Sequence, residues 1–363
     1  MSKKILELCL SPDLGGLELC VVDYFKYFSL KTETFLCVEK DKKIDNYIKS
    51  DNKFTLKRNK FFPIIPALKL AKFIDEYSID VVHIHWTRDI AMSVLAKLFS
   101  KQKPSLIQSR HMTMTRFKDD FYHKWLYKNM DMLHAVTNQV KAQLLEFIPS
   151  SVRPRIEMVY LGVEESVVDK QRVEFLKQEY KLSNHFVIGM VGRIEEGKGQ
   201  YLLIEALSKL KESDIKVLIV GNSMKDTYLE KLKLKVKTLG LEDKVVFTGF
   251  TKEINEHISL CDVTVLATKK ETFGLVVIES MVNSVPVIAT NKGGPLEIIE
   301  NSVDGLLFDR SSEDLAEKIR TLYANSDLKK SLAMHAYKSV KIKFDKGTQM
   351  QKMYEVINEN FSY

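Results

Sequence analysis

Residues 269–297 read KKETFGLVVIESMVNSVPVIATNKGGPLE. Two carboxylates in this stretch, Glu271 and Glu279, are separated by seven residues, and the apolar run between them predicts a helix that begins near Gly274. Glu271 then lies in the loop before the helix and Glu279 lies within it. The first N–H groups of a helix have no partner inside it, and the helix dipole adds partial positive charge there. Amides that bind phosphates beside carboxylates that bind hydroxyls predict a phosphorylated sugar or a nucleotide as the ligand, and Gly274 lets that ligand approach the backbone.

The motif E-T-F-G-x4-E-S-M at residues 271–281, followed by P-V-I-A-T and G-G-P-x-E, resembles the donor-site signature of family-4 retaining glycosyltransferases, the bacterial group 1 glycosyltransferases. The resemblance spans most of the chain and is strongest over residues 186–308. It implies an α/β chain with the GT-B fold: two Rossmann-like domains that face each other across a cleft, and a C-terminal helix that crosses back to the first domain. Ser280 and Ser284 stand where the family more often has Ala and Gly, but neither change removes a group that would bind a ligand.

The resemblance also implies roles for the residues of the motif. A nucleotide-diphosphate sugar would bind the second domain, where Glu279 would accept from its ribose hydroxyls and Glu271, a catalytic residue, from its sugar hydroxyls. The donor site would be completed by the backbone of Thr272, Phe273, Gly274 and Leu275. No D-x-D triplet occurs in the chain, so a metal-dependent transferase of the GT-A type is disfavoured. We therefore expect no metal and no cofactor besides the donor substrate.

Residues 192–199 read GRIEEGKG and follow a predicted strand over residues 186–191. They nearly match G-x4-G-K-[ST], the P-loop of nucleotide triphosphatases, but the hydroxyl that would hold magnesium is missing because position 199 is Gly. A P-loop ATPase is therefore the weaker alternative. The segment is also similar to the phosphate-binding segment of the glycosyltransferase family. There Arg193 and Lys198 would act as catalytic and donor-binding cations on the leaving diphosphate, Arg through a fork of donors and Lys through a point charge.

A predicted strand over residues 5–10, the turn SPDLGG and a predicted helix over residues 17–28 open the chain. Strand, glycine turn and helix together make a place where backbone amides face a ligand. In the resembled family this loop contacts the donor phosphate or the acceptor, so we assign Gly16 to the donor and Gly15 to the acceptor. A tight turn without a ligand remains the alternative.

His111 follows a predicted strand over residues 105–109. A side chain at the carboxyl end of a strand in an α/β layer faces the ligand crevice, and the resembled family has a functional His near the reacting sugar at this point. We therefore predict that His111 is catalytic, with a role in capping the loop as the alternative. Arg110 is less usual there, and we assign it to an acidic group of the acceptor.

His83 and His85 lie in a predicted strand over residues 80–85. Alternation puts both imidazoles on one face of the strand, which zinc could use. The sequence offers no nearby carboxylate or further Cys or His to complete a ligand set. Histidines of the core or of the cleft lining are therefore the favoured interpretation.

Length and charge bound the remaining possibilities. The 363 residues, 45% hydrophobic and 28% charged, suit a globular chain of two domains. Residues 1–164 have a net charge of +7 and residues 165–363 a net charge of zero. An acidic partner would therefore dock on the first half. Because no nucleic-acid module is recognisable, we expect no nucleic acid and favour an anionic membrane surface.

Two basic and aromatic segments could meet such a surface. Residues 56–70 mix Lys57, Arg58, Lys60, Phe61 and Phe62 with apolar residues, and a helix predicted over residues 117–130 has aromatic residues along one side. Packing of these rings on the core is the alternative in both cases. The apolar run at the N-terminus is interrupted by Glu7, and no stretch reaches the roughly 20 apolar residues of a spanning helix. We expect a cytoplasmic protein, peripheral at most on the inner face of the cytoplasmic membrane.

We place an acceptor-binding domain at residues 1–164, a donor-binding domain at 165–340 and a helix at 341–363 that packs back on the first domain. The predicted function is retaining transfer of a sugar to an acceptor hydroxyl, on a saccharide of a lipopolysaccharide, a lipooligosaccharide or another lipid-linked glycan. Two alternatives stay open: a nucleotide-sugar epimerase with the GT-B fold, and a non-catalytic, membrane-associated protein that binds sugar nucleotides.

Overall fold

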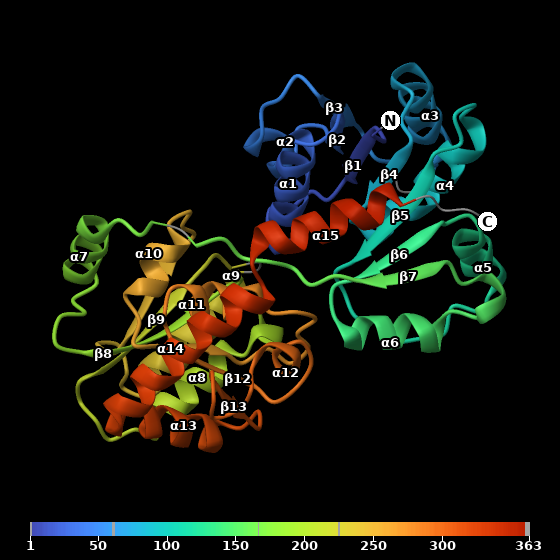
Figure 1. Cartoon of the computed structure of the whole chain (residues 1–363). Helices are drawn as coiled ribbons and strands as arrows, with labels where there is room; N and C mark the ends of the chain where they lie inside the picture. Colours follow the sequence, from blue (N-terminus) through green and yellow to red (C-terminus); the bar gives the residue numbers. More distant parts are fainter. Residues whose placement is uncertain (1, 60–61, 166, 224–225, 360–363) are drawn as a thin grey trace. The chain divides into compact units, whose positions relative to one another are not determined.

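The computed structural model describes residues 2–59, 62–165, 167–223 and 226–359. The chain divides into two compact units: Met1–Leu161 together with Thr348–Tyr363 form unit 1, and Gly162–Gly347 form unit 2. Each unit contains one parallel β-sheet with helices (Figure 1). Among the described residues, no helix combines the length and the apolar character needed to cross a bilayer.

The sheet of unit 1 has seven strands in the order β3-β2-β1-β4-β5-β6-β7. The strands are β1 (Ile5–Cys9), β2 (Thr34–Glu39), β3 (Lys53–Leu56), β4 (Val81–Ile84), β5 (Ser105–Arg110), β6 (Met132–Ala135) and β7 (Arg155–Met158). The helices of this part are α1 (Gly16–Ser29), α2 (Lys43–Tyr47), α3 (Ile64–Tyr77), η1 (Thr87–Asp89), α4 (Ile90–Phe99), α5 (Phe121–Lys128), α6 (Asn138–Phe147) and η2 (Ser150–Val152). The central strands are buried, as expected for parallel strands covered by helices on both faces.

The sheet of unit 2 has six strands in the order β10-β9-β8-β11-β12-β13. They are β8 (Phe186–Val191), β9 (Ile215–Val220), β10 (Val245–Gly249), β11 (Val263–Leu266), β12 (Val287–Thr290) and β13 (Leu306–Phe308). The helices are α7 (Lys170–Glu179), η3 (Glu196–Lys198), α8 (Gln200–Leu207), α9 (Asp226–Thr238), α10 (Ile254–Ser259), α11 (Leu275–Val282), α12 (Pro295–Ile298), α13 (Ser312–Ala324) and α14 (Ser326–Lys343).

The strand orders fix where a ligand can bind. In unit 1 the chain leaves β1 for β2 on one side and reaches β4 on the other, and in unit 2 it does the same around β8 with β9 and β11. The carboxyl ends of β1 and β4, and those of β8 and β11, are therefore topological switch points, where open parallel sheets bind ligands. The loops at residues 192–199 and 267–274 follow β8 and β11 directly.

The end of the chain differs from the predicted helix over residues 341–363. Helix α14 ends at Lys343, the helical conformation is interrupted at Phe344, and α15 (Lys346–Asn358) follows. At the break the backbone pairs with Val163 instead of continuing the helix: Val163 N donates to Phe344 O at 2.9 Å, and Lys346 N donates to Val163 O at 3.1 Å. Helix α15 packs beside α1 within unit 1, where Tyr27 Oη donates to Gln351 Oε1 at 2.9 Å (Figure 1). Residues 360–363 of the predicted helix lie outside the described residues.

Most predicted elements are found within a few residues, and three differences have local causes. Helix α5 begins at Phe121 instead of residue 117 because the Asp120 side chain caps it, accepting from His123 N at 3.0 Å. The edge strands β3 and β13 were not predicted, since three or four residues give too short a pattern. Of the segment 56–70, Lys60 and Phe61 lie outside the described residues, and Phe62 is 66% exposed.

Candidate active site

The loops after β8 and β11 meet at the switch point of unit 2. Lys269 N donates to Gly197 O at 2.8 Å, which joins the two loops through the backbone. The side chains also meet: Lys198 Nζ lies 3.1 Å from Glu271 Oε2, and the two side chains are 25% and 15% exposed. The cation and the carboxylate that the sequence singled out in separate motifs are therefore in direct, partly buried contact.

Gly199 has a backbone conformation that other residues avoid, with φ +84°. A Cβ at this position would lie 2.4 Å from Ala267 O, so a larger residue would displace the neighbouring loop. The amides beside it are occupied, because Lys198 N donates to Glu195 O at 2.9 Å and Gly199 N to Glu196 O at 3.3 Å. The Ser or Thr of a P-loop does not fit here, and the P-loop alternative is disfavoured.

Arg193 is not in the same contact. Its guanidinium lies 3.7 Å from Glu195, the side chain is 54% exposed, and the part of the chain that the structure describes gives it no ion pair with Glu271. Its backbone is held by Gln200, whose Nε2 donates to Arg193 O at 2.9 Å. The role of Arg193 in binding a donor therefore stays a prediction.

Helix α11 begins at Leu275, one residue after Gly274, as the motif predicted. The ring of Phe273 is buried and packs edge-on against Phe344, with 5.8 Å between the ring centroids. Phe273 can therefore offer a ligand only its backbone. Gly294 packs against this loop, and its N–H donates to Glu271 O at 3.0 Å. A Cβ on Gly294 would lie 2.2 Å from Phe273 O, so only glycine fits at this position.

The rest of the motif consists of Thr272 in the loop before α11 and of residues on α11 itself. Thr272 and Glu279 are half-buried, and Glu279 O accepts from Asn283 Nδ2 at 2.7 Å. Ser280 Oγ donates to Val276 O at 2.8 Å, within the helix. This position, where the family more often has Ala, therefore offers no free hydroxyl to a ligand.

The backbone conformation of Ser284 explains why the family more often has Gly at this position. It follows the last turn of α11 with φ +56°, a left-handed conformation that costs an ordinary residue about 1–2 kcal/mol. We expect Ser284→Gly to increase the free energy of unfolding by about 0.5–1 kcal/mol, after the entropic cost of glycine is subtracted. Urea unfolding of the variant and the wild type measures this difference. An unchanged or lower stability would show that the conformation at Ser284 is not strained.

Glycines stand at the ends of three neighbouring strands of unit 2: Gly192 follows β8, Gly221 follows β9 and Gly249 is the last residue of β10. Gly192 N donates to Val220 O and Gly221 N to Gly249 O, both at 2.9 Å. A Cβ on Gly221 would lie 2.0 Å from Gly192 O. The carboxyl edge of β8, β9 and β10 is therefore lined by backbone. Gly221 was not among the predicted site residues, although a glycine at the end of each of these strands is visible in the sequence.

In unit 1 the predicted acceptor residue Arg110 is 8% exposed and holds its own loop. Its Nε donates to Met112 O at 2.8 Å, one terminal nitrogen to Thr113 O at 3.2 Å and the other to Thr87 Oγ1 at 3.1 Å. His111, beside it, is half-buried. The arrangement gives Arg110 a structural task and offers no support for contact with an acceptor.

In the glycine turn of unit 1, a side chain of the following helix binds a backbone amide of the turn. Helix α1 begins at Gly16, and Gly15 N donates to Glu18 Oε2 at 2.8 Å. Glu18 is buried, so one of the amides predicted to face a ligand already has a carboxylate partner. The assignments of Gly15 and Gly16 stay predictions.

The expectation that no carboxylate accompanies His83 and His85 is wrong. Glu7 on β1 lies opposite His83 on β4 in the parallel register, and its carboxyl group contacts both imidazoles. The shared face predicted for the two histidines is confirmed, and all three residues are buried. Ligand atoms of the three lie within 4.8 Å of one another. The carboxylate was missed because it lies 76 positions from His83 and only strand pairing brings the two together.

Two arginines stack on one ring: Arg58, which the sequence placed in a basic segment without a site role, and Arg88, which it did not single out. The guanidinium carbon of Arg58 lies 4.6 Å from the centroid of Trp86, and that of Arg88 lies 5.3 Å from it. Both follow strands of the first sheet at its ligand-binding edge, β3 and β4. No carboxylate within the described residues forms an ion pair with either arginine, so the pair can meet an anionic group.

Asp89 beside them is buried, with one carboxyl oxygen accepting from Leu10 N at 2.8 Å and the other unpartnered within the described residues. Burial raises the pKa of Asp89 to about 7. Ionisation therefore costs stability as the pH rises from the unfolded value near 3.8 to 7. We expect Asp89→Asn to match the wild type at pH 4 and to exceed its free energy of unfolding by about 2–4 kcal/mol at pH 8. Urea unfolding at both values measures this, and an equal gain at pH 4 would contradict the assignment.

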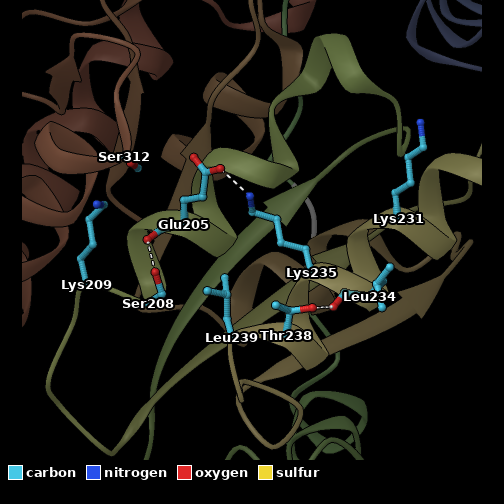
Figure 2. A pocket seen from close by; sticks show the side chains of 9 residues that line it. All are labelled: Glu205, Ser208, Lys209, Lys231, Leu234, Lys235, Thr238, Leu239 and Ser312. Carbon is cyan, nitrogen blue, oxygen red and sulfur yellow. Dashed lines mark hydrogen bonds and ion pairs between the residues drawn. The ribbon is translucent and has the colours of Figure 1, made fainter.

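A groove of about 570 Å³ lies elsewhere in unit 2, between α8, α9 and α13. Figure 2 shows Glu205 and Lys235 pointing toward one another in this groove, with 2.5 Å between Oε1 and Nζ. None of its lining residues is a predicted site residue. We therefore do not assign the groove to the active site.

Comparisons with known proteins cover both units. The sequence model described as "Glycosyl transferases group 1" matches residues 153–339, and that described as "Glycosyltransferase Family 4" matches residues 24–167. The chain is 26% identical to N-acetyl-alpha-D-glucosaminyl L-malate synthase of Bacillus anthracis, over 80% of this chain and 77% of that protein. It is also 26% identical, over 77% of this chain and 76% of the other protein, to the N-acetylgalactosamine-N,N'-diacetylbacillosaminyl-diphospho-undecaprenol 4-alpha-N-acetylgalactosaminyltransferase of Campylobacter jejuni.

Among solved structures, HepE of Anabaena in complex with UDP-glucose matches with a TM-score of 0.86 at 22% identity, over 98% of this chain and 99% of that one. Two parallel α/β units that match over almost the whole chain define the GT-B fold, which confirms the fold implied by the motifs. The chain belongs to the group 1 glycosyltransferases.

Proposed function

We propose that the protein transfers a sugar from a nucleotide-diphosphate sugar to an acceptor hydroxyl, with retention of the anomeric configuration. The contact of Lys198 with Glu271 at the switch point of unit 2 supports this function. It places a cation, a carboxylate and the start of α11 in neighbouring loops. A ligand with a diphosphate at one end and hydroxyls at the other matches that combination of groups.

The chemistry follows from where charge grows. As the glycosidic bond breaks, negative charge develops on the leaving diphosphate. Lys198, Arg193 and the first amides of α11 stabilise it without a bound metal. Glu271 orients the sugar hydroxyls, Glu279 the ribose, and His111 supplies a hydrogen-bonding imidazole near the reacting sugar. We expect transfer to survive removal of divalent metal ions by EDTA.

The acceptor is proposed to be a lipid-linked glycan with an anionic group. Arg58 and Arg88, stacked on Trp86, suit a phosphate or a carboxylate better than Arg110, which holds its own loop. The Campylobacter relative has diphospho-undecaprenol in its name. The net charge of +7 over residues 1–164 agrees with an anionic acceptor or surface.

Nucleotide release from UDP-, GDP- and ADP-sugars, with and without lipid-linked acceptor, tests the function. Release that depends on the acceptor supports transfer, and the anomeric configuration of the product decides retention. Conversion of the donor without any acceptor would identify an epimerase. Binding without any turnover would identify a sugar-nucleotide-binding protein, and hydrolysis of ATP with magnesium would identify an ATPase.

Peripheral membrane binding is proposed through the residues just before α3 and its first turns. Phe62, two residues before α3, is 66% exposed, Ile65 in its first turn is 61% exposed, and the exposed Lys69 and Lys72 follow. We expect the protein to bind vesicles with anionic lipids at low salt and to leave them as salt screens the lysines. Phe62→Ser with Ile65→Ser should weaken binding about tenfold, from the apolar area lost. Vesicle sedimentation measures this.

A matched control is Leu30→Ser, because Leu30 is 82% exposed at the end of α1 and outside the α3 segment. This variant should bind vesicles like the wild type. Failure of the wild type to bind anionic vesicles even at low salt would remove the membrane proposal and leave the transferase proposal intact.

A further inference from the structure

A chain of hydrogen bonds runs through the buried centre of the first sheet. The neighbouring strands β1, β4, β5 and β6 contribute Glu7, His83, Ser109 and His134, and none of the four side chains is more than 1% exposed. We call these four residues, together with His85, the buried chain. Tyr24 of α1 covers it, with ring centroids 5.3 Å from His83 and 5.4 Å from His85.

The buried chain ends at the backbone oxygen of Val159, and this end decides which atom donates in each hydrogen bond next to it. Val159 O can only accept, so Nε2 of His134, 2.8 Å away, carries a proton. Nδ1 of a neutral His134 is then an acceptor and takes the hydroxyl proton of Ser109 at 2.6 Å. Ser109 Oγ has given its only proton, so it accepts from Nε2 of His83 at 2.7 Å. Nδ1 of a neutral His83 is left without a proton.

Glu7 must therefore supply one. Nδ1 of His83 lies 3.0 Å from Oε1 of Glu7, and an ionised carboxylate there would put two acceptors in contact. A protonated Glu7 donates through Oε1 to His83, and its other oxygen accepts from Nε2 of His85. Nδ1 of His85 is then unprotonated and accepts a hydrogen bond from Nε2 of His111 at 3.3 Å.

We propose that the buried chain is a tautomer relay: a protonated Glu7 fixes His85, and His85 holds His111 with a proton on Nε2 and none on Nδ1. His111 then presents Nδ1 as a hydrogen-bond acceptor for a substrate hydroxyl. Glu7 and His85 are positioning residues, which act through His111. Their effect on catalysis rests on the function proposed for His111, whereas the tautomers do not depend on it.

Burial favours the neutral form of every group in the buried chain. It raises the pKa of Glu7, against the lowering effect of the hydrogen bond with His85. Burial also lowers the pKa of His83 and His85 to about 3 and that of His134 to about 4. A bound metal is the competing use of Glu7, His83 and His85. Both ring nitrogens of His83 and His85 already have hydrogen-bond partners, however, which a metal would displace.

Nitrogen-15 NMR of the full chain, labelled in its histidine rings, tests the tautomers directly. At neutral pH we expect a protonated Nε2 and an unprotonated Nδ1 in each of His83, His85, His111 and His134. An imidazolium at His83, or a proton on Nδ1 of His111, would overturn the relay. Stoichiometric zinc in the purified protein would overturn it too.

Kinetics of Glu7 variants test the positioning role. In Glu7→Gln the amide donates to His83 and accepts from His85 as the protonated carboxyl group does, so kcat should stay within about threefold of the wild type. Glu7→Ala leaves His85 free to turn, and kcat should fall about tenfold with little change in the donor KM. A loss in Glu7→Gln as large as that in Glu7→Ala would overturn the positioning role.

A double-mutant cycle separates this inference from the proposed function. Because Glu7 acts through His111, adding Glu7→Ala to His111→Ala should cost no further kcat. Additive losses would show that Glu7 acts by another route and would overturn the positioning role. A wild-type kcat in His111→Ala would overturn the role proposed for His111 and the positioning role with it, while the NMR pattern decides the tautomers independently.

Discussion

Lys198→Ala is expected to lower kcat for glycosyl transfer about a hundredfold or more, because one preorganised group on the developing charge is worth roughly 3–4 kcal/mol. Lys198 Nζ lies 3.1 Å from Glu271 Oε2, so removing it changes both the cation on the diphosphate and the partner of the carboxylate. The fold should remain, since a partly exposed ion pair contributes little to stability. Initial rates at saturating donor, together with thermal unfolding, measure the two effects separately.

Lys209→Ala is the matched control for this variant. Lys209 Nζ lies 2.8 Å from Glu313 Oε1 at the surface groove of unit 2, and its side chain is 41% exposed. It is a lysine in an ion pair of the same unit, but it belongs to no predicted site, so its loss should leave kcat unchanged. Near-normal turnover in Lys198→Ala would remove the main support for the proposed reaction.

The parts of the site that lie within one short motif could be predicted from the sequence. Gly274, Leu275 and the start of α11 are local, since a helix start depends on a few consecutive residues. The pairing of Lys198 with Glu271 joins two loops 73 positions apart, and the sequence indicated it only because both motifs resemble parts of one known site. Periodicity alone would not have brought these residues together.

Features that depend on packing between distant strands or loops could not be predicted. Glu7 reads as a charge that interrupts an apolar run, and only the register of β1 with β4 reveals its histidine partners. From the sequence, Arg110 is a cation at a strand end that is available to a ligand. In the structure its guanidinium instead donates to the carbonyl groups of its own loop. The break at Phe344 likewise coincides with backbone pairing to the distant Val163, which the helical pattern of the chain end does not show.

Gly199→Ser is expected to abolish glycosyl transfer and to lower the free energy of unfolding by about 2–4 kcal/mol. The residue has φ +84°, which a serine adopts only under strain. Its Cβ would also lie 2.4 Å from Ala267 O, in the loop that leads to Glu271. That loop must move, and the contact between Lys198 and Glu271 moves with it. Urea unfolding and transfer rates on the same preparation measure both losses.

The same variant separates the proposed function from the P-loop alternative, because serine at position 199 completes the motif G-x4-G-K-S. A protein that works through a P-loop should gain magnesium-dependent ATP hydrolysis from this change, whereas a glycosyltransferase held by the observed backbone should lose stability and gain nothing. Gly197→Ser is the control: Gly197 has no atom within 4 Å of an added Cβ and no positive φ, so its free energy of unfolding should stay near the wild type. Wild-type stability in Gly199→Ser, or ATP hydrolysis that appears with it, would contradict the geometry on which the donor site depends.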